Sequence, residues 1–376
     1  MKRKILYITG SRADYGLMQS VLEEINNDPY LELEIVVTGM HLMKEFGSTL
    51  NEIKKDRFKI QEIDVTFSDD DKFSMSFFIG KLIMELTERI KVIKPDIILL
   101  LGDRSEMLAG AILGTYLSIP IAHIHGGDIT STVDEHARHA ITKLAHIHFP
   151  ATENSARRII RMGEDPWRVH IAGSPAIDSI SKENLIEPKG IAKNYDLDLS
   201  KPILIVVQHP VTMKFKDSAS QILETLNAIS ELKYQTILIY PNADAGGRNI
   251  IKLLKKFEEK PFIQMFKSLP RNDYLSLMNI ATIMIGNSSS GIVEAPYFNL
   301  PVVNIGDRQR KRERGNNVID VDYDKYEISS AIEFILNKKI RKYESPYGTR
   351  ETGKKISEIL KSIKINEKLL QKKIAY

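Results

Sequence analysis

The stretch Lys4–Gly16 reads KILYITGSRADYG. It opens with large apolar residues that do not alternate with polar ones, which is typical of a parallel strand buried on both faces. At Gly10 it changes to small, polar and charged residues, and the amphipathic segment Tyr15–Asn26 follows. A strand, a glycine break and a helix in this order form the repeating unit of an α/β domain.

The same unit recurs along the chain, with further amphipathic segments at Phe77–Lys91 and Ser105–Leu117. The predicted strands of the first half are Lys4–Thr9, Leu33–Thr38, Ile97–Leu101, Ile119–Ile124, Ile147–Pro150 and Val169–Ala172. Those of the second half are Ile203–Val207, Thr236–Tyr240, Phe262–Phe266, Thr282–Ile285 and Val302–Ile305. The polar stretch Ser181–Lys201 between them is predicted to be a linker. Two Rossmann-like halves with parallel sheets are therefore expected.

We expect domains at residues 1–182 and 200–352, with a C-terminal helix at 353–376 packing back on the first domain. The tail from Tyr323 onward is rich in lysine and helical in propensity, and Pro346–Gly348 divides it. Its charge is more consistent with a solvated helix face than with a basic contact patch.

Composition excludes several classes of protein. The 376 residues contain no cysteine, which rules out disulfides, thiolate nucleophiles and thiolate metal sites. No apolar run approaches the roughly 18 residues that span a bilayer, and the N-terminal apolar run stops at Gly10, too early for a signal peptide. The formal net charge of +4 is mild and compatible with an anionic small substrate. We expect a cytoplasmic protein with no membrane or nucleic-acid partner.

Nearly every predicted strand ends in small, polar or charged residues. These clusters are Gly10–Gly16, Thr38–His41, Gly102–Arg104, His123–Asp128, Gly173–Pro175, Gln208–Pro210, Pro241–Asp244, Gly286–Gly291 and Gly306–Gln309. Open α/β sheets bind ligands beyond the carboxyl ends of their strands, so two facing domains would bring these clusters into one cleft.

The cluster Gly286–Gly291 reads GNSSSG and precedes a predicted helix, an arrangement that suits a phosphate. A helix cap formed by Asn287 or Ser288 explains the pattern equally well. Arg12, Arg104 and Arg308 each follow a strand, and arginine forks match phosphate oxygens, which favours a diphosphate ligand. The chain has neither a Walker A nor a GxGxxG pattern, so it is not an ordinary P-loop or dinucleotide enzyme.

Titratable residues are densest between Asp103 and His139. Carboxylates held close together separate one another's pKa values and can provide an acid and a base. A metal site is the alternative, with His136, His139 and Asp134 spaced for one helix face, but helical histidines are more often structural. No GxSxG elbow supports a serine hydrolase.

With these motifs assembled, the chain resembles the UDP-N-acetylglucosamine 2-epimerase family, and more closely its hydrolysing branch, which makes N-acetylmannosamine for sialic acid synthesis. The matching stretches are Gly10–Met18, Thr38–His41, Gly102–Arg104, His123–Asp128, Val133–Leu144, His209–Pro210, Gly286–Gly291 and Gly306–Gln309. They occur in the family's order and span about Met1–Val318.

The resemblance implies a glycosyltransferase-B-like fold with a nucleotide sugar between the domains, no metal and no cofactor. It implies elimination of the nucleotide to give a 2-acetamidoglucal, followed by addition of water. The catalytic residues that we expect are Asp103, His125, Asp134, Glu135 and His209. The expected substrate-binding residues are Arg12, Asp14, Gly16, His41, Arg104, Asn242, Ser268, Ser288, Ser289, Glu294 and Arg308.

His125 stands where many members of the family have glutamate, and in this it resembles enzymes acting on a bacillosamine-type 2,4-diacetamido sugar. The main expectation is hydrolysis of UDP-N-acetylglucosamine to UDP and N-acetylmannosamine, with the diacetamido sugar as the alternative. A glycosyltransferase or a non-catalytic nucleotide-sugar binding module remains a rival. A homo-oligomer, dimer or tetramer, is also expected.

Overall fold

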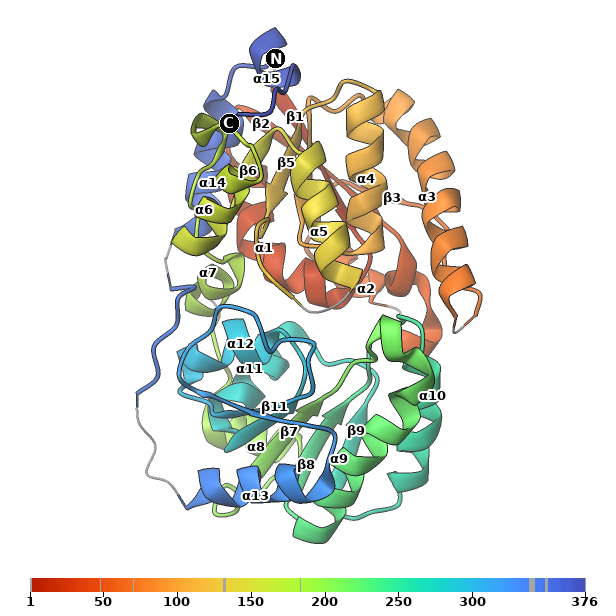
Figure 1. Cartoon of the computed structure of the whole chain (residues 1–376), viewed down its shortest axis with the longest axis vertical. Helices are drawn as coiled ribbons and strands as arrows, with labels where there is room; N and C mark the ends of the chain where they lie inside the picture. The colour runs from red at the N-terminus through yellow and green to blue at the C-terminus, as the bar shows by residue number, and fades with distance from the viewer. Residues whose placement is uncertain are drawn as a thin grey trace.

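The computed structural model describes residues 2–47, 49–69, 71–130, 133–182, 184–337, 342–348 and 351–375. It has two lobes, one above the other in Figure 1, and each is built on a six-stranded parallel sheet with helices on both faces. This is the two-domain α/β, glycosyltransferase-B-like architecture that the sequence predicts. In the described ranges, none of the helices combines the length and the apolar character needed to cross a bilayer.

The first sheet has the strand order β3-β2-β1-β4-β5-β6. Its strands are β1 (Arg3–Thr9), β2 (Leu31–Val37), β3 (Ile60–Glu62), β4 (Ile97–Leu101), β5 (Ile121–Ile124) and β6 (Ile147–Phe149). Its helices are α1 (Arg12–Asn27), α2 (Leu50–Lys55), α3 (Lys72–Ile93), α4 (Ser105–Tyr116), α5 (Val133–Leu144), α6 (Glu153–Arg161) and α7 (Pro175–Lys182).

Both faces of the first sheet are buried, which explains why its strands are apolar without alternation. Ile5 and Tyr7 of β1 pack in one core with α1. Leu6 and Ile8 pack in the opposite core with α3 and α4. Successive residues of β1 therefore point to opposite cores, as the two-residue period of a strand requires. In the sheet, Ile5 lies opposite Leu33 of β2 and Ile97 of β4.

The second sheet repeats the topology, in the order β12-β11-β10-β7-β8-β9. Its strands are β7 (Ile203–Val207), β8 (Gln235–Ile239), β9 (Ile263–Phe266), β10 (Ile283–Gly286), β11 (Val302–Ile305) and β12 (Val318–Val321). Its helices are α8 (Pro188–Asn194), α9 (Ser218–Leu232), α10 (Gly247–Leu254), α11 (Arg271–Ile280), α12 (Ser290–Val293) and α13 (Lys325–Leu336). In each sheet the strand order reverses beside the lobe's first strand, so β1 with β4, and β7 with β10, form the two switch points where ligands bind in such folds.

The structure corrects several local predictions. Val169–Ala172 is not a strand, since only Val169 makes a bridge, to His148. The edge strands β3 and β12 were not predicted, because one is three residues long and the other contains polar Asp320. The stretch predicted as a linker contains α8, which begins at Pro188 and buries Ile191 and Ala192.

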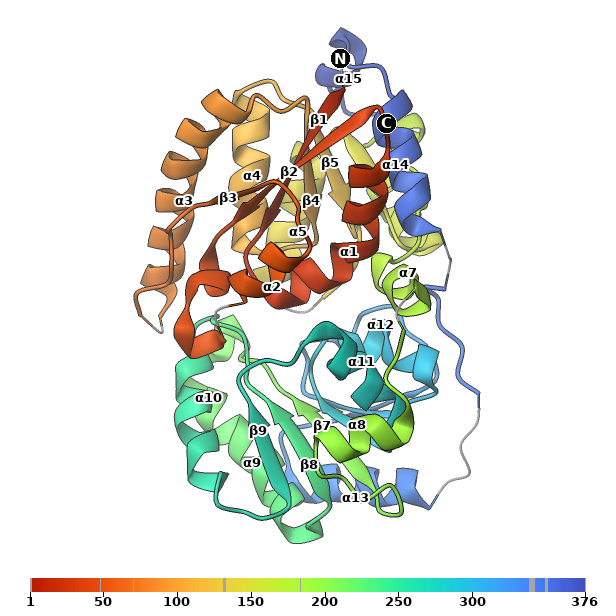
Figure 2. The same cartoon turned by 180° about the vertical axis from the view of Figure 1, so that it is seen from behind.

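The C-terminal residues return to the first lobe, where α14 (Thr352–Ser362) lies beside α1 (Figure 2) and α15 (Glu367–Leu370) follows. Ile356 and Leu360 of α14 enter the same core as Met18 of α1. The carboxylate of Asp178 in α7 accepts hydrogen bonds from the backbone N–H of Glu351 at 2.6 Å and of Gly353 at 2.8 Å. These bonds hold the start of α14 against the first lobe.

Candidate active site

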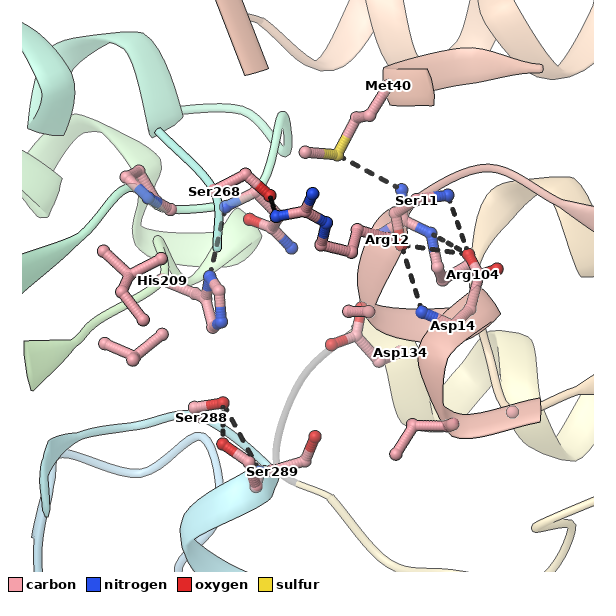
Figure 3. Close-up of a pocket in the computed structure, with 18 of the residues that line it drawn as sticks. Ser11, Arg12, Asp14, Met40, Arg104, Asp134, His209, Ser268, Ser288 and Ser289 are labelled. Atoms are coloured by element: carbon pink, nitrogen blue, oxygen red, sulfur yellow. Dashed lines mark hydrogen bonds and ion pairs between the residues drawn. The ribbon is translucent and has the colours of Figure 1, made fainter. Parts of the chain in front are cut away.

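The two switch points face each other across a cavity of about 300 Å³ between the lobes. Figure 3 shows Arg12, Asp14, Arg104 and Asp134 reaching it from the first lobe, opposite His209, Ser268, Ser288 and Ser289 of the second. Thirteen of the sixteen expected site residues line this cavity: Arg12, Asp14, Asp103, Arg104, His125, Asp134, His209, Asn242, Ser268, Ser288, Ser289, Glu294 and Arg308.

Gly16, His41 and Glu135 are not among the lining residues, so the structure does not support their expected contact with substrate. His41 is buried, and its ring nitrogens lie 2.9 Å from Thr9 Oγ1 and 2.5 Å from Thr49 Oγ1. Glu135 accepts a hydrogen bond from the N–H of Thr130 at 2.8 Å. His41 is thus held by the end of β1 and by Thr49, and Glu135 is held by the loop that precedes α5.

Gly16 lies where the two lobes come close together. A Cβ added there would lie 3.1 Å from the Cδ of Arg271 in the second lobe. The missing side chain therefore leaves room for Arg271 at the cavity, which is a packing reason for glycine at this position.

Sequence reasoning missed several lining residues, and the most important are the basic side chains Arg138, Lys267, Arg271 and Arg312. With Arg12, Arg104 and Arg308 they bring the cations to seven, against four carboxylates, among the lining residues that the structure describes. Arg138 stood inside a matched motif, and Lys267 directly follows the strand β9, whereas Arg271 and Arg312 do not directly follow a strand. The excess of positive charge suits a ligand that carries at least two negative charges.

Arg104 is held in a carboxylate-rich setting at the end of β4. Its Nη2 lies 3.2 Å from Glu106 Oε1, and its Nε lies 3.8 Å from Asp14 Oδ2. Burial opposes the charged form, but the carboxylates of Glu106, Asp244 and Asp14 together raise the pKa of Arg104 above its ordinary value. The guanidinium is thus a fixed cation.

Asp14 organises the loop that follows β1. Its Oδ2 accepts hydrogen bonds from the N–H of Ser11 at 2.9 Å and of Gly10 at 3.2 Å, and it completes a capping box with Ser11 at the start of α1. Burial raises the pKa of Asp14 to about 6 against the opposing charge of Arg104. These contacts favour a positioning role for Asp14 over direct contact with substrate.

Arg12 joins the first lobe to the second. Its Nη1 donates to Ser268 Oγ at 2.5 Å, and its Nε donates to Glu52 at 2.9 Å. Burial lowers the pKa of Arg12 to about 10, so the group stays charged at neutral pH. Arg12 and Ser268 therefore form one wall of the cavity from opposite lobes.

Two first-lobe groups that can move protons line the cavity. Asp103 forms an ion pair with the buried guanidinium of Arg138. His125 has φ of +60°, an uncommon conformation for a side-chain-bearing residue, and its buried Nε2 has no hydrogen-bond partner among the described residues. Burial lowers the pKa of His125 to about 4, so its ring is neutral at pH 7. Tyr347 stacks against it with ring centres 6.4 Å apart.

Asp134, near the start of α5, reaches across the cleft. Its Oδ2 accepts a hydrogen bond of 3.3 Å from Nη2 of Arg308, whose Nη1 donates to the carbonyl of Asn287 at 3.2 Å. This ion pair connects the carboxylate cluster of the first lobe with the serine-rich loop of the second.

His209 follows β7 and is fixed on both sides. The side-chain amide of Asn287 accepts from the backbone N–H of His209 at 2.7 Å and donates to its carbonyl at 2.9 Å. The backbone N–H of Asn242 donates to Nδ1 of the ring at 3.1 Å. Burial and the charges of Arg308 and Arg104 lower the pKa of His209 to about 3. The ring is therefore neutral.

The GNSSSG loop differs in part from its prediction. A Cβ on Gly286, whose φ is +127°, would lie 2.1 Å from the carbonyl oxygen of Val207, so glycine is required there. The following helix, α12, has only four residues. Its N-cap is Ser289, whose side chain makes no capping hydrogen bond, and Ser288 and Ser289 both line the cavity. Glu294 forms an ion pair with Arg271 at the end of this loop.

Within the described ranges, no three His, Asp or Glu side chains gather as a metal site would require. The sequence-based expectation of a site without metal or cofactor stays a prediction.

The fold and the site together define a two-lobed α/β protein with a cationic cleft suited to a nucleotide sugar. A family model described as UDP-N-acetylglucosamine 2-epimerase matches residues 23–361. The chain belongs to the UDP-N-acetylglucosamine 2-epimerase family.

Two relatives and one solved structure show how this chain compares with others. A protein of Legionella pneumophila named UDP-N,N'-diacetylbacillosamine 2-epimerase (hydrolyzing) is 41% identical over 377 residues, which is 100% of both chains. A Neisseria meningitidis protein named UDP-N-acetylglucosamine 2-epimerase is 37% identical over 333 residues, covering 88% of this chain and 87% of that protein. A crystal structure of UDP-GlcNAc 2-epimerase from Neisseria meningitidis bound to UDP-GlcNAc has a TM-score of 0.79 at 19% identity, covering 95% of this chain and 99% of that one. The last comparison supports the fold.

Proposed function

We propose that this enzyme, a hydrolysing nucleotide-sugar 2-epimerase, acts on UDP-2,4-diacetamido-2,4,6-trideoxyglucose and releases UDP and the free 2-epimer. The observation that carries the proposal is the 41% identity, over the full length of both chains, to a hydrolysing epimerase named for the diacetylbacillosamine nucleotide. The relative named for UDP-N-acetylglucosamine is 37% identical over 88% of this chain. The diacetamido sugar therefore takes precedence over UDP-N-acetylglucosamine, which was the main expectation from sequence.

In this proposal the diphosphate lies among the cations at the two switch points. Arg12 and Arg104 face it from the first lobe, with Ser288 and Ser289 on the other side. The neutral ring of His209, whose Nδ1 is occupied by the Asn242 N–H, donates through Nε2. Fixed donors aimed at a departing anion stabilise the charge that develops as its bond breaks. We place the nucleoside portion near Asn242, Glu294 and Arg308.

The reaction that we propose has two steps. A base of the first lobe takes the proton from carbon 2, the C–H electron pair forms the carbon 1–carbon 2 double bond, and the carbon 1–oxygen bond breaks with its electrons leaving on UDP. Water then adds across the double bond of the glycal, with hydroxide going to carbon 1 and a proton to carbon 2 from the opposite face. The product is the free sugar with inverted carbon 2.

Asp103, Asp134 and His125 are the proposed proton-transfer groups. Removal of a weakly acidic C–H proton requires a base within hydrogen-bond reach and partly removed from water. His125 has a buried Nε2 without a partner among the described residues. Asp103 is paired with Arg138 of the same lobe, and Asp134 is paired with Arg308 of the second lobe. The proposed reaction removes a proton from one face of carbon 2 and adds a proton to the opposite face, which requires more than one such group.

A small recess beside the cavity is consistent with an acetamido group. Leu17, Ala176 and Val293 line it, together with His125, and its volume is about 30 Å³. That is room for about two water-sized groups, comparable with the carbonyl and methyl of an acetyl substituent.

The proposal is tested by incubating the enzyme with UDP-diacetylbacillosamine and with UDP-N-acetylglucosamine in deuterated water. We expect free 2-epimer carrying deuterium at carbon 2, with a kcat/KM at least tenfold higher for the diacetamido substrate. A preference for UDP-N-acetylglucosamine would reverse the assignment of the sugar. UDP release without deuterium at carbon 2 would indicate a transferase, and unchanged substrate would indicate a binding module.

A further inference from the structure

A second cavity, of about 250 Å³, lies between the lobes outside the candidate active site. Its first-lobe wall is the face of α6 that carries Arg157, Arg158 and Arg161, and its second-lobe wall includes Lys311 and Glu313. The buried residue Asp128 also lines it. The cavity is thus lined by four cationic side chains from two lobes and by two carboxylates.

Both carboxylates of this second cavity already have partners. Asp128 accepts from Ser155 Oγ and from Arg312 Nη2, each at 2.7 Å. Glu313 accepts from Thr152 Oγ1 at 2.7 Å and from Asn154 Nδ2 at 2.9 Å. Neither forms an ion pair with the four lining cations in the part of the chain that the structure describes.

The four cations therefore exceed the negative charge of the cavity, since Asp128 is paired with Arg312 and, among the described lining residues, Glu313 is left as one carboxylate against four cations. Arg158 donates to the neutral carbonyl of Gly127, and no carboxylate within the described ranges pairs with Arg157, Arg161 or Lys311. Arg157 and Arg161 are four residues apart on one helix, an arrangement that destabilises a helix by like-charge repulsion. Lys311 adds repulsion across the lobe interface. A bound anion would relieve both effects.

The same loop contributes to both cavities. Arg308 and Arg312 of the segment 306–315 line the candidate active site, whereas Lys311 and Glu313, which lie beside them in sequence, line the second cavity. The two cavities are also connected by the buried ion pair between Asp128, which lines the second cavity, and Arg312, which lines the candidate active site. A ligand that draws Lys311 toward α6 would therefore hold the second lobe, with Arg308 and Arg312, against the first.

We propose that this second cavity binds a small phosphate-bearing anion, free phosphate or a phosphate monoester, and that the bound anion favours the closed arrangement of the two lobes. At about 250 Å³ the cavity is nearly as large as the candidate active site, so a phosphate or phosphate monoester fits together with water. Arginine forks on one side and a lysine on the other match the oxygens of a phosphate. The inference goes beyond the proposed function, since it concerns a site that does not contact the reacting sugar.

Binding is measured by isothermal titration with inorganic phosphate, and separately with glycerol 3-phosphate, at constant ionic strength. The full-length enzyme is first saturated with UDP, so that the candidate active site is occupied. We expect one saturable phosphate site in the wild type and at least tenfold weaker binding in the double variant Arg157→Ala, Arg161→Ala. The control double variant Lys354→Ala, Lys364→Ala removes the same charge from exposed positions of the first lobe and should bind as the wild type does.

Kinetics provides the second readout. Phosphate should lower the KM for the nucleotide sugar about fivefold in the wild type and in the control variant, in line with ordinary coupling between sites. The Arg157→Ala, Arg161→Ala enzyme should show unchanged activity without phosphate and no such decrease. Equal phosphate affinity in both double variants, or no saturable binding to the UDP-saturated wild type, would overturn the proposal. A failure of UDP itself to bind would count against the proposed function instead.

Discussion

The backbone N–H of Asn242 donates a hydrogen bond of 3.1 Å to Nδ1 of His209. An amide nitrogen can only donate, so Nδ1 must be the acceptor and the neutral ring must carry its proton on Nε2. The loop after β8 thereby fixes the tautomer of a residue that follows β7. Since His209 lines the cavity, this bond determines that the ring presents a donor, and not an acceptor, to a ligand.

The first prediction concerns this donor. His209→Ala should lower kcat by about 100-fold, because the departing diphosphate loses a fixed hydrogen bond. Steady-state release of UDP measures the effect. The matched control is His136→Ala, which removes an exposed imidazole of α5 that does not line the cavity, and it should retain wild-type turnover. Equal kcat in the two variants would remove His209 from the reaction.

Asp103→Asn should lower turnover by about two orders of magnitude or more, since the amide cannot accept the carbon-2 proton or assist the group that does. UDP affinity, measured by titration, should stay within a few-fold of the wild type. Asp64→Asn, at an exposed position, is the control for charge alone. If Asp103→Asn keeps full turnover, Asp103 has no part in the proton transfer.

Stability should decrease steeply as the pH falls from about 6.5 toward 4. Burial lowers the pKa of six histidines to about 3 or 4: His41, His123, His125, His146, His148 and His209. In this pH window the histidines of the unfolded chain bind more protons than those of the folded chain. The free energy of unfolding therefore decreases as the pH decreases. Each histidine can lower the free energy of unfolding by at most about 1.4 kcal/mol per pH unit.

Asp14 acts in the opposite direction in this window, because burial raises its pKa to about 6 and the folded state keeps its proton below that pH. Burial also raises the pKa of Asp244, but two carboxyls do not offset six imidazoles. Thermal unfolding followed between pH 7.5 and pH 4.5 should show a falling Tm, and His123→Gln should flatten the slope by about one proton. A Tm that is constant over this range would contradict the prediction.

The C-terminal residues should be required for the stability of the first lobe. Arg168 is 2% exposed, and its guanidinium donates to the backbone carbonyls of Leu369 and Lys368, each at 2.8 Å. Deletion of residues 364–376 leaves this buried cation without those acceptors, which costs at least about 3 kcal/mol. Urea unfolding monitors the loss. Lys368→Ala keeps the carbonyl and should have little effect, so comparable losses in both proteins would refute the role of Arg168.

Much of the site follows from sequence because of how parallel sheets are built. All strands of a parallel sheet end at the same edge, so residues that directly follow β1 and β4 must lie near one another. Arg12, Asp103 and Arg104 were found in this way, and His209 and Ser288 follow from the same rule in the second lobe. These residues line the cavity as expected.

The same rule does not tell which way a side chain points. His41 follows β2 yet turns its ring to Thr9 and Thr49, and Glu135 turns to the backbone of Thr130. Arg138 lies more than one turn inside α5 and still reaches Asp103. Side-chain direction depends on packing against residues distant in sequence, and the local pattern does not contain that information.

The sequence by itself determined the two parallel sheets, the break between them and the polar residues at each strand end, because apolar runs, glycines and their spacing are local properties of the chain. Only the tertiary structure decided which residues meet across the lobes. Arg12 contacts Ser268, and Arg308 contacts Asp134, across 256 and 174 positions of sequence. Such contacts depend on how closely the lobes approach, and that distance results from the packing of the whole interface.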